Sequence, residues 1–227
     1  MTQPLNVGIY LFDSMTMLDG YAPLQILSFV EQFNTFTFAK EKKLLNSDCG
    51  ALLSPDHDFE SCPPLDIIVV PGGGDVFAQM TDAKVISFLQ QQSTNAKYIT
   101  SVCTGALILA EAGLLNGYRA TTHWAYIDQL SKYPDIEVVD ERVAVDRDRI
   151  SGGGITAGLD FALTLVVETV GSEIAQTIQL IFEYRPQPPY NSGSPETAPQ
   201  PIVDTVKAMV TGRNQPMIQF ISEKYSD

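Results

Sequence analysis

The chain has 227 residues, of which 44% are hydrophobic and only 18% are charged. Acidic residues outnumber basic ones 27 to 14, and the resulting formal charge of −13 makes nucleic acid and anionic membranes unfavourable partners. No apolar stretch approaches the roughly 18–20 uninterrupted residues that a membrane helix requires, and the first residues lack the layout of a secretory signal. We therefore predict a cytoplasmic protein with one large core.

Strand-like and helix-like segments alternate in the first half of the chain. Apolar runs of the kind found in doubly covered strands are followed by segments with apolar residues at helical spacing. The predicted strands are residues 5–12, 34–39 and 66–71, the predicted helices are residues 18–30 and 85–92, and short strands with a hairpin at 48–50 are expected within 40–64.

The second half continues the alternation. The expected strands are residues 97–101 and 119–121, a hairpin is expected from 142–146 and 149–151, and the expected helices are residues 104–112, 123–132, 155–170, 172–184 and about 202–210. Strands that alternate with helices imply right-handed crossovers, and hence an α/β fold with a mostly parallel sheet covered on both faces. We predict a single domain over 1–227, with 186–201 a Pro/Ser/Gly-rich arm and 202–227 a C-terminal helical segment.

The strand-like run before Cys103 passes directly into a helix-like run. Such a corner strains the backbone of its central residue and points that side chain over the end of the sheet, where ligands bind in open α/β folds. The helix that follows directs its N-terminal N–H groups at the sulfur, which predicts a lowered thiol pKa. Cys103 is therefore the candidate nucleophile, whereas Cys49 and Cys62 are read as buried or incidental thiols.

Gly72, Gly73 and Gly74 follow a strand that should lie beside the Cys103 strand. Glycine lets the backbone approach a ligand closely, so the N–H groups of Gly73, Gly74 and Thr104 are candidate donors of an oxyanion-type site. A simple tight turn explains the glycines as well. The run is not a phosphate-binding loop, because Asp75 follows it and no lysine stands at the required place.

Asp19 lies just after the first strand, between apolar residues. It is either a helix N-cap or a carboxyl group at the rim of the sheet, where an apolar setting raises its pKa and suits it to proton transfer.

His123 is either a base or a structural residue at a helix start. The run 152–154 either binds an anion or packs closely at a crowded corner. The charged turn at 146–149 is read as a solvated hairpin.

Several of these segments resemble the DJ-1/PfpI superfamily, which shares the class I glutamine amidotransferase-like fold. The motifs that carry the resemblance are Val70-Pro71-Gly72-Gly73, Ser101-Val102-Cys103-Thr104-Gly105, Ala120-Thr121-Thr122-His123-Trp124 and the segment from Gly152 to Asp160. Within the superfamily the chain looks most like the bacterial isonitrile hydratases, and this likeness extends into residues 191–199.

The resemblance implies a homodimer of flavodoxin-like three-layer sandwiches that uses a cysteine nucleophile elbow, with no metal and no organic cofactor. By position, Cys103 matches the family nucleophile, Asp19 the acidic residue that contacts it, and Thr104 a residue whose backbone and hydroxyl line the same site. The implied reaction is hydration of a small isonitrile to an N-substituted formamide through a thioimidate.

Two departures disfavour other chemistries of the superfamily. Thr104 stands where PfpI-type proteases carry a histidine, and neither His57 nor His123 is followed two residues later by the glutamate that glutamine amidotransferases need. Two alternatives to the hydratase remain. One is a redox or electrophile sensor whose thiol oxidises, and the other is the sensor half of an AraC-type regulator without its DNA-binding part.

Overall fold

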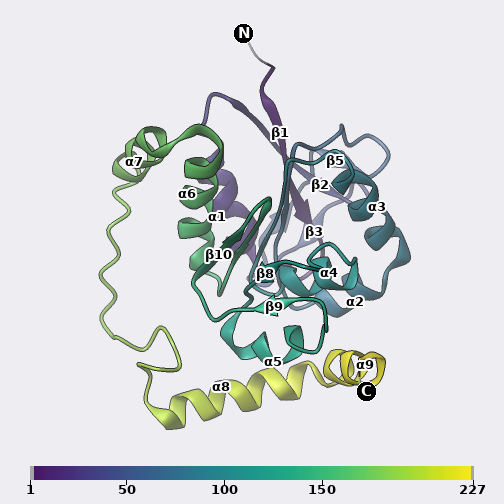
Figure 1. Ribbon diagram of the computed structural model, residues 1–227, viewed down its shortest axis with the longest axis vertical. Helices are drawn as coiled ribbons and strands as arrows, with labels where there is room; N and C mark the ends of the chain where they lie inside the picture. The colour runs from purple at the N-terminus through teal and green to yellow at the C-terminus, as the bar shows by residue number, and fades with distance from the viewer. Residues whose placement is uncertain (1–2, 226–227) are drawn as a thin grey trace.

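The computed structural model describes residues 3–225 as an α/β sandwich around a seven-stranded sheet (Figure 1). The strand order is β10-β11-β7-β6-β1-β2-β5. These strands are β1 Leu5–Leu11, β2 Phe33–Ala39, β5 His57–Asp58, β6 Ile67–Val70, β7 Tyr98–Val102, β10 Val143–Asp146 and β11 Arg149–Gly152. All neighbours pair in parallel except β10 and β11, which form the predicted hairpin.

The centre of the sheet consists of the most apolar strands. β1 and β6 contain almost only aliphatic and aromatic residues, and every residue of β6 is buried. A strand that is covered on both faces needs such a continuous apolar run, because neither face meets water. These strands place the turns after Leu11, Val70 and Val102 side by side at one edge of the sheet.

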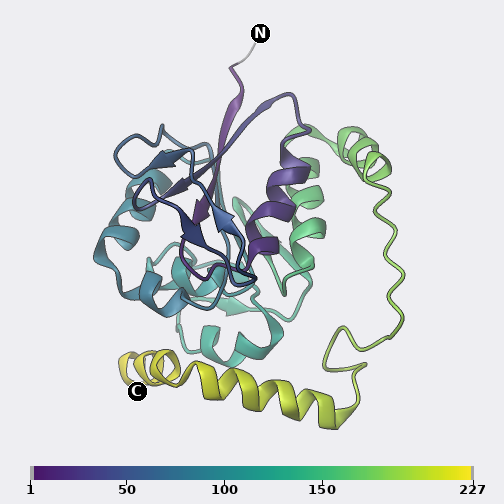
Figure 2. The ribbon, with the colours of Figure 1, turned by 180° about the vertical axis from the view of Figure 1, so that it is seen from behind.

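Helices cover both faces of the sheet (Figures 1 and 2). Helices α1 and α6 pack against each other on one face, α6 also contacts α7, and α2, α3 and α4 contact one another on the other face. Their bounds are α1 Met17–Leu27, α2 Val76–Thr81, α3 Ala83–Ser93, α4 Gly105–Glu111, α6 Ala157–Val170 and α7 Ser172–Ile181. None of the helices in the described part of the chain is long and apolar enough to cross a membrane.

Short elements differ most from the sequence predictions. The region predicted as one helix over 123–132 contains a 3-10 turn, η1 Trp124–Tyr126, and a single helical turn, α5 Ile127–Leu130. Helix α2 was not predicted. The expected strand at 119–121 is β8 Arg119–Ala120, which pairs with β9 Glu137–Val138, while β3 Leu45–Asn46 and β4 Leu52–Leu53 form the expected hairpin around 48–50.

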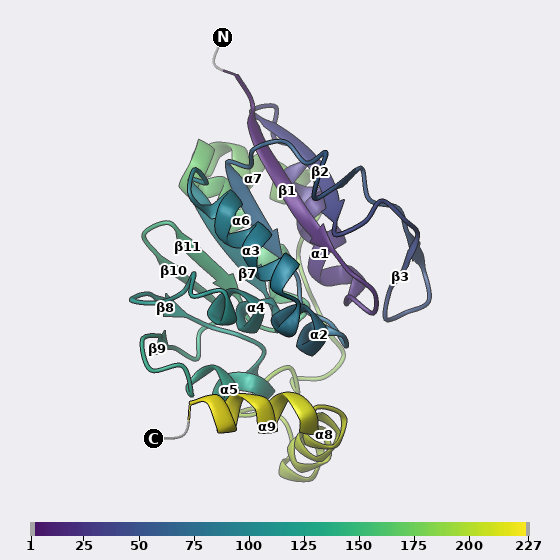
Figure 3. The same ribbon diagram turned by 90° about the vertical axis from the view of Figure 1, so that its right-hand side faces the viewer.

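The C-terminal region forms two helices rather than the one that was predicted. Residues 182–199 contain no helix or strand, and α8 Gln200–Arg213 and α9 Gln215–Lys224 follow. Helix α8 contacts η1, and both helices lie at the end of the molecule where α5 lies (Figures 1 and 3). Helix α9 buries Met217 and Ile221. Its Lys224 pairs with Glu111 at the end of α4, so this segment is docked on the helix that follows Cys103.

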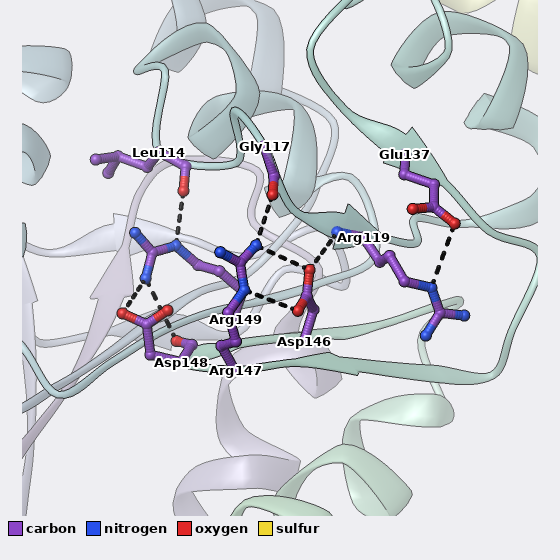
Figure 4. A network of polar contacts seen from close by, with 8 residues as sticks. All are labelled: Leu114, Gly117, Arg119, Glu137, Asp146, Arg147, Asp148 and Arg149. Carbon is purple, nitrogen blue, oxygen red and sulfur yellow. Dashed lines mark hydrogen bonds and ion pairs between the residues drawn. The ribbon is translucent and has the colours of Figure 1, made fainter.

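The β10–β11 turn is more than a solvated hairpin (Figure 4). Arg147 and Arg149 stack on the Tyr118 ring at 3.9 and 4.3 Å, and Arg149 Nε donates to the Leu114 carbonyl oxygen at 2.7 Å. The Asp146 carboxylate accepts the Arg119 backbone N–H at 2.8 Å. These contacts tie the edge of the sheet to the loop after α4.

Candidate functional site

Cys103 occupies the corner between β7 and α4, as predicted. Its φ of 57° lies in the left-handed region, which a non-glycine residue adopts only where the surroundings enforce it. The Cys103 N–H donates to the carbonyl oxygens of Gly152 at 3.0 Å and Gly153 at 2.8 Å, and the Thr122 hydroxyl donates to the Cys103 carbonyl oxygen at 2.8 Å. Both ends of the strained residue are therefore held by hydrogen bonds.

Gly105 allows α4 to begin directly at this corner. A Cβ at that position would lie 2.0 Å from the Val70 carbonyl oxygen, so only glycine lets α4 pack this closely against the end of β6. Gly72 meets the same corner from the neighbouring strand end. A Cβ there would lie 2.4 Å from the Thr104 hydroxyl oxygen and 3.0 Å from Asp19 Oδ2. The two glycines bring the β6 and β7 turns into contact.

Asp19 is completely buried in the first turn of α1, and it does not cap that helix, because Thr16 holds the N-cap position. Its Oδ2 accepts the Gly72 N–H at 3.0 Å. Its Oδ1 has no hydrogen-bond partner among the protein groups described, although the carboxyl group interacts with the Cys103 thiol. Of the two roles that the sequence left open for Asp19, the structure excludes the N-cap.

Burial dominates the protonation of this thiol–carboxyl pair. It raises the pKa of Asp19 to about 7, the direction that an apolar setting predicts. Burial and the Asp19 charge also raise the pKa of the Cys103 thiol well above its usual range, although the Thr104 N–H and hydroxyl oppose this change. The prediction that the helix N-terminus lowers this thiol pKa is therefore wrong. Asp19 is the titratable group that interacts with the Cys103 thiol.

The three predicted backbone donors have different partners. The Thr104 N–H interacts with the Cys103 sulfur, and the Gly73 N–H donates to the Thr104 hydroxyl oxygen at 3.1 Å. The Gly74 N–H donates to the Ser14 carbonyl oxygen at 2.8 Å, so it is occupied by the loop after β1. In this arrangement the Thr104 amide faces the Cys103 sulfur, Gly73 fixes the Thr104 side chain, and Gly74 closes a turn.

His123 has a structural contact. Its Nδ1 accepts the Ala125 N–H at 3.2 Å, which caps η1, and burial lowers its pKa. The imidazole lies against Gly154, where a Cβ would be 3.2 Å from its Cδ2 atom. The run 152–154 is thus used for close packing and for the two carbonyl oxygens that hold Cys103, which favours the packing interpretation of these glycines.

A cavity of about 670 Å³ opens beside His123 and residues 153–154. Its lining includes Thr122 and Gly153, both bonded to the Cys103 backbone, together with Trp124, Ile155 and residues 193–196 of the arm. A cavity of this volume accommodates a small organic molecule. Cys103, Asp19 and Thr104 are not among its lining residues, so the arm lines a cavity next to the site.

The other two cysteines differ from each other. Cys49 is exposed, so of the two predicted readings, buried or incidental, the buried one does not hold for it, and its Sγ lies 3.3 Å from the Ser47 hydroxyl oxygen. Cys62 is half-buried, and burial raises the pKa of its thiol to about 12. Neither belongs to the site around Cys103.

Two contributions to the site were missed in the sequence. Gly72, and not Gly73 or Gly74, is the glycine that contacts Asp19, and Thr122 holds the Cys103 carbonyl oxygen. The motif at 120–124 was noticed, but attention went to its histidine. A buried carbonyl oxygen needs a hydrogen-bond donor, and a threonine hydroxyl beside a strained residue can supply one. The threonine in this motif was therefore the feature of the sequence that pointed to Thr122.

Residues 6–168 match the DJ-1/PfpI family, and the chain belongs to this family. Its α/β fold, with a mostly parallel sheet and a buried cysteine at the elbow, is the flavodoxin-like fold predicted from the sequence. A THiJ/PfpI family protein from Pseudomonas syringae superposes with a TM-score of 0.92 at 36% identity, covering 97% of this chain and 91% of that one.

Two curated relatives have different descriptions. The chain is 46% identical over 203 residues to the isonitrile hydratase of Pseudomonas putida, with 89% of each protein covered. It is also 29% identical over 188 residues to the HTH-type transcriptional regulator GbdR of Pseudomonas aeruginosa, where the match covers 80% of this chain and 51% of the regulator. The first relative matches along most of its length, and the second along about half.

Proposed function

We propose that the protein is a cysteine-dependent isonitrile hydratase, which adds water to a small isonitrile and releases an N-substituted formamide. The contact between the buried Asp19 carboxyl group and the Cys103 thiol carries this proposal, because it joins a nucleophile to a group that both accepts and donates protons near neutral pH. The similarity to the Pseudomonas putida enzyme over 89% of the chain supports the choice of substrate.

The reaction proceeds in two stages with one water consumed. Asp19 takes the thiol proton, the Cys103 sulfur bonds to the terminal isonitrile carbon, and Asp19 returns the proton to that carbon to give a thioimidate. Asp19 then removes a proton from water as the water oxygen attacks the same carbon, and passes this proton to the nitrogen. The hydroxyl of the resulting intermediate loses its proton to Asp19 as the carbonyl forms and the carbon–sulfur bond breaks. Asp19 returns that proton to the sulfur, and the formamide leaves. A carboxyl pKa near 7 suits both directions of transfer.

Thr104 supports both stages in this mechanism. Its N–H stabilises the sulfur as it becomes an anion, and its hydroxyl, oriented by the Gly73 N–H, faces the same sulfur. Gly74 has no direct role, because its N–H is bonded to Ser14.

The test is incubation with a simple alkyl isonitrile and detection of the formamide. We expect turnover by the wild type, none above background for Cys103→Ala, and a loss of kcat for Asp19→Asn. Denaturing mass spectrometry during turnover should show an adduct on Cys103 with the mass of the isonitrile. Full turnover by Cys103→Ala refutes covalent catalysis, and an unchanged kcat for Asp19→Asn refutes proton transfer by the carboxyl group.

The same assay separates the hydratase from the alternatives. The similarity to GbdR favours a ligand-sensing domain as the second candidate, and such a domain binds a small molecule without releasing a formamide. A redox sensor uses the same activated thiol, which oxidises without releasing a formamide. Absence of formamide together with saturable binding of a small molecule favours the sensing domain.

A homodimer in the cytoplasm completes the proposal. Apolar side chains are exposed on neighbouring helices of one face, with Val167 on α6 and Leu180 and Ile181 on α7. Leu180 is 81% exposed, which is unusual for a leucine in a monomer and suits a surface covered by a second copy. Light scattering after gel filtration should give twice the mass of the chain, and Leu180→Lys should shift it toward the monomer.

A further inference from the structure

Four segments that are distant in sequence line the cavity of about 670 Å³ beside His123. They are residues 122–124, 140–142, 153–156 and 193–196, the last from the arm that runs along the outside of the molecule from α7 to α8 (Figure 1). Two of these segments hold the Cys103 backbone, through the Thr122 hydroxyl and the Gly153 carbonyl oxygen, each at 2.8 Å. The cavity thus adjoins the Cys103 corner, yet the proposed reaction uses none of its charged side chains.

Trp124 is the aromatic side chain of this cavity. It is the single tryptophan of the chain, it is half-buried, and it also lines two smaller cavities of about 120 and 240 Å³. The His123 imidazole stacks on it with the ring centroids 5.7 Å apart, which fixes the orientation of the indole. An indole beside open space attracts organic cations, because the face of the ring carries negative charge.

Two of the charged side chains in the cavity are neutralised by neighbours. Arg142 Nε donates to the Asp160 carboxylate at 2.6 Å. The Glu141 carboxylate accepts from the Arg119 guanidinium at 2.7 Å. These two pairs leave the sign of the cavity to its remaining charged groups.

The remaining charges are negative. Asp140 and Glu196 also line the cavity, and neither forms an ion pair within residues 3–225. A hydrogen bond from Ser194 lowers the pKa of Glu196, so this carboxyl group is ionised at neutral pH. His123 adds no positive charge, because its Nδ1 accepts the Ala125 N–H and burial lowers its pKa.

We propose that this cavity binds an organic cation, an ammonium group on a small apolar or aromatic body. The body packs against the Trp124 indole, and the ammonium group faces the carboxylates of Asp140 and Glu196. The cavity volume is in the range of small-molecule sites. An organic anion is disfavoured, because the one guanidinium that lines the cavity is already paired with Asp160.

The test titrates the full chain with three probes of the same shape and different charge, namely benzylammonium, benzyl alcohol and benzoate. The readout is the fluorescence of Trp124, which reports on this cavity alone because the chain has no other tryptophan. We expect saturable binding of benzylammonium, about tenfold tighter than that of benzyl alcohol, and no binding of benzoate. Added salt should weaken the binding of benzylammonium and leave that of benzyl alcohol unchanged.

Two variants test the carboxylates. Asp140→Asn and Glu196→Gln should each weaken benzylammonium about threefold and leave benzyl alcohol unchanged. Glu168→Gln is the matched control, because it removes the same charge at an exposed position that does not line the cavity, and it should change neither affinity. Both tested residues are exposed, so the variants should fold, which circular dichroism checks.

Three results would overturn the proposal. They are a Trp124 signal that does not saturate with benzylammonium, equal affinities for benzylammonium and benzyl alcohol, and equal effects of Glu168→Gln and the two cavity variants. The last result would mean that benzylammonium responds only to the net charge of the protein.

Two sources supply such an ammonium group, the substituent of the isonitrile or a separate ligand. Benzylammonium that raises KM for an alkyl isonitrile without changing kcat indicates the substituent, and any other effect on turnover indicates a separate ligand. The binding measurement needs no isonitrile, so it tests the cavity even if the protein releases no formamide and the proposed function fails.

Discussion

Replacing Asp19 by asparagine should change how the stability of the protein depends on pH. The carboxyl group is completely buried, and its pKa is raised from 3.8 to about 7. Below pH 4 it is protonated in both the native and the unfolded chain. Between pH 4 and 7 the unfolded chain ionises while the native state keeps its proton, so the free energy of unfolding falls as the pH rises.

The magnitude follows from the size of the shift. Each pKa unit corresponds to about 1.4 kcal/mol, so a shift of about three units costs about 4 kcal/mol once both states are ionised, near pH 8. Asparagine carries no charge and keeps an oxygen that accepts the Gly72 N–H. Relative to the wild type, Asp19→Asn should therefore gain about 4 kcal/mol of stability between pH 4 and pH 8.

Urea unfolding followed by circular dichroism at pH 4, 6 and 8 measures this difference. Subtracting the two proteins at each pH cancels the groups that they share. Asp128→Asn is the matched control, since it makes the same change at an exposed carboxyl group. A constant difference between Asp19→Asn and the wild type from pH 4 to 8 would refute the assignment of a raised carboxyl pKa.

Three further substitutions test the geometry around the site. Gly72→Ala places a Cβ 2.4 Å from Thr104 Oγ1 and should cost about 1–3 kcal/mol in urea unfolding, whereas at Gly74 the nearest atom is 3.6 Å away and alanine should cost less. Thr122→Val leaves the nucleophile's carbonyl oxygen without its donor, so its free energy of unfolding should fall by about 1–3 kcal/mol, and Thr122→Ser should restore it. Glu111→Ala should weaken the docking of α9, seen as faster amide hydrogen exchange in α9 but not in β1. The same exchange rate of α9 in the variant and the wild type would contradict the docking.

The sheet and the elbow could be predicted because local patterns determine them. Continuous apolar runs mark β1 and β6 as doubly covered strands, and the passage from strand to helix at Cys103 leaves the chain no other geometry. The long helices α1 and α6 also follow from apolar spacing along the chain.

The partners within the site could not be predicted, because they depend on contacts between distant segments. Thr16 rather than Asp19 holds the N-cap position, and the partner of the buried Asp19 carboxyl group, the Gly72 N–H, is 53 residues away. The direction of the Cys103 thiol pKa depends on how completely α1 and α4 exclude water, and burial outweighs the helix N-terminus. The local sequence pattern indicates that a helix follows Cys103, but it does not indicate how deeply the thiol is buried.

The C-terminal helices could be predicted only in part. Apolar spacing near residues 202–210 indicated a helix, but α8 and α9 present mostly exposed residues, and Met217 and Ile221 of α9 join a core built by segments that are distant in sequence. Asn214 ends one helix and starts the next, which is a common place for asparagine. Its contact with Tyr126, 88 residues away, leaves no mark in the local pattern.

The docking of α9 has a practical consequence for protein engineering. β1 begins at the end of the molecule away from α8 and α9 (Figure 1). The Tyr225 ring packs on Tyr133, with the centroids 4.5 Å apart, and the Tyr133 hydroxyl donates to Glu111 at the end of α4. A fusion partner or affinity tag placed before β1 therefore lies away from this packing, whereas the same addition after α9 competes with contacts to the helix that follows Cys103.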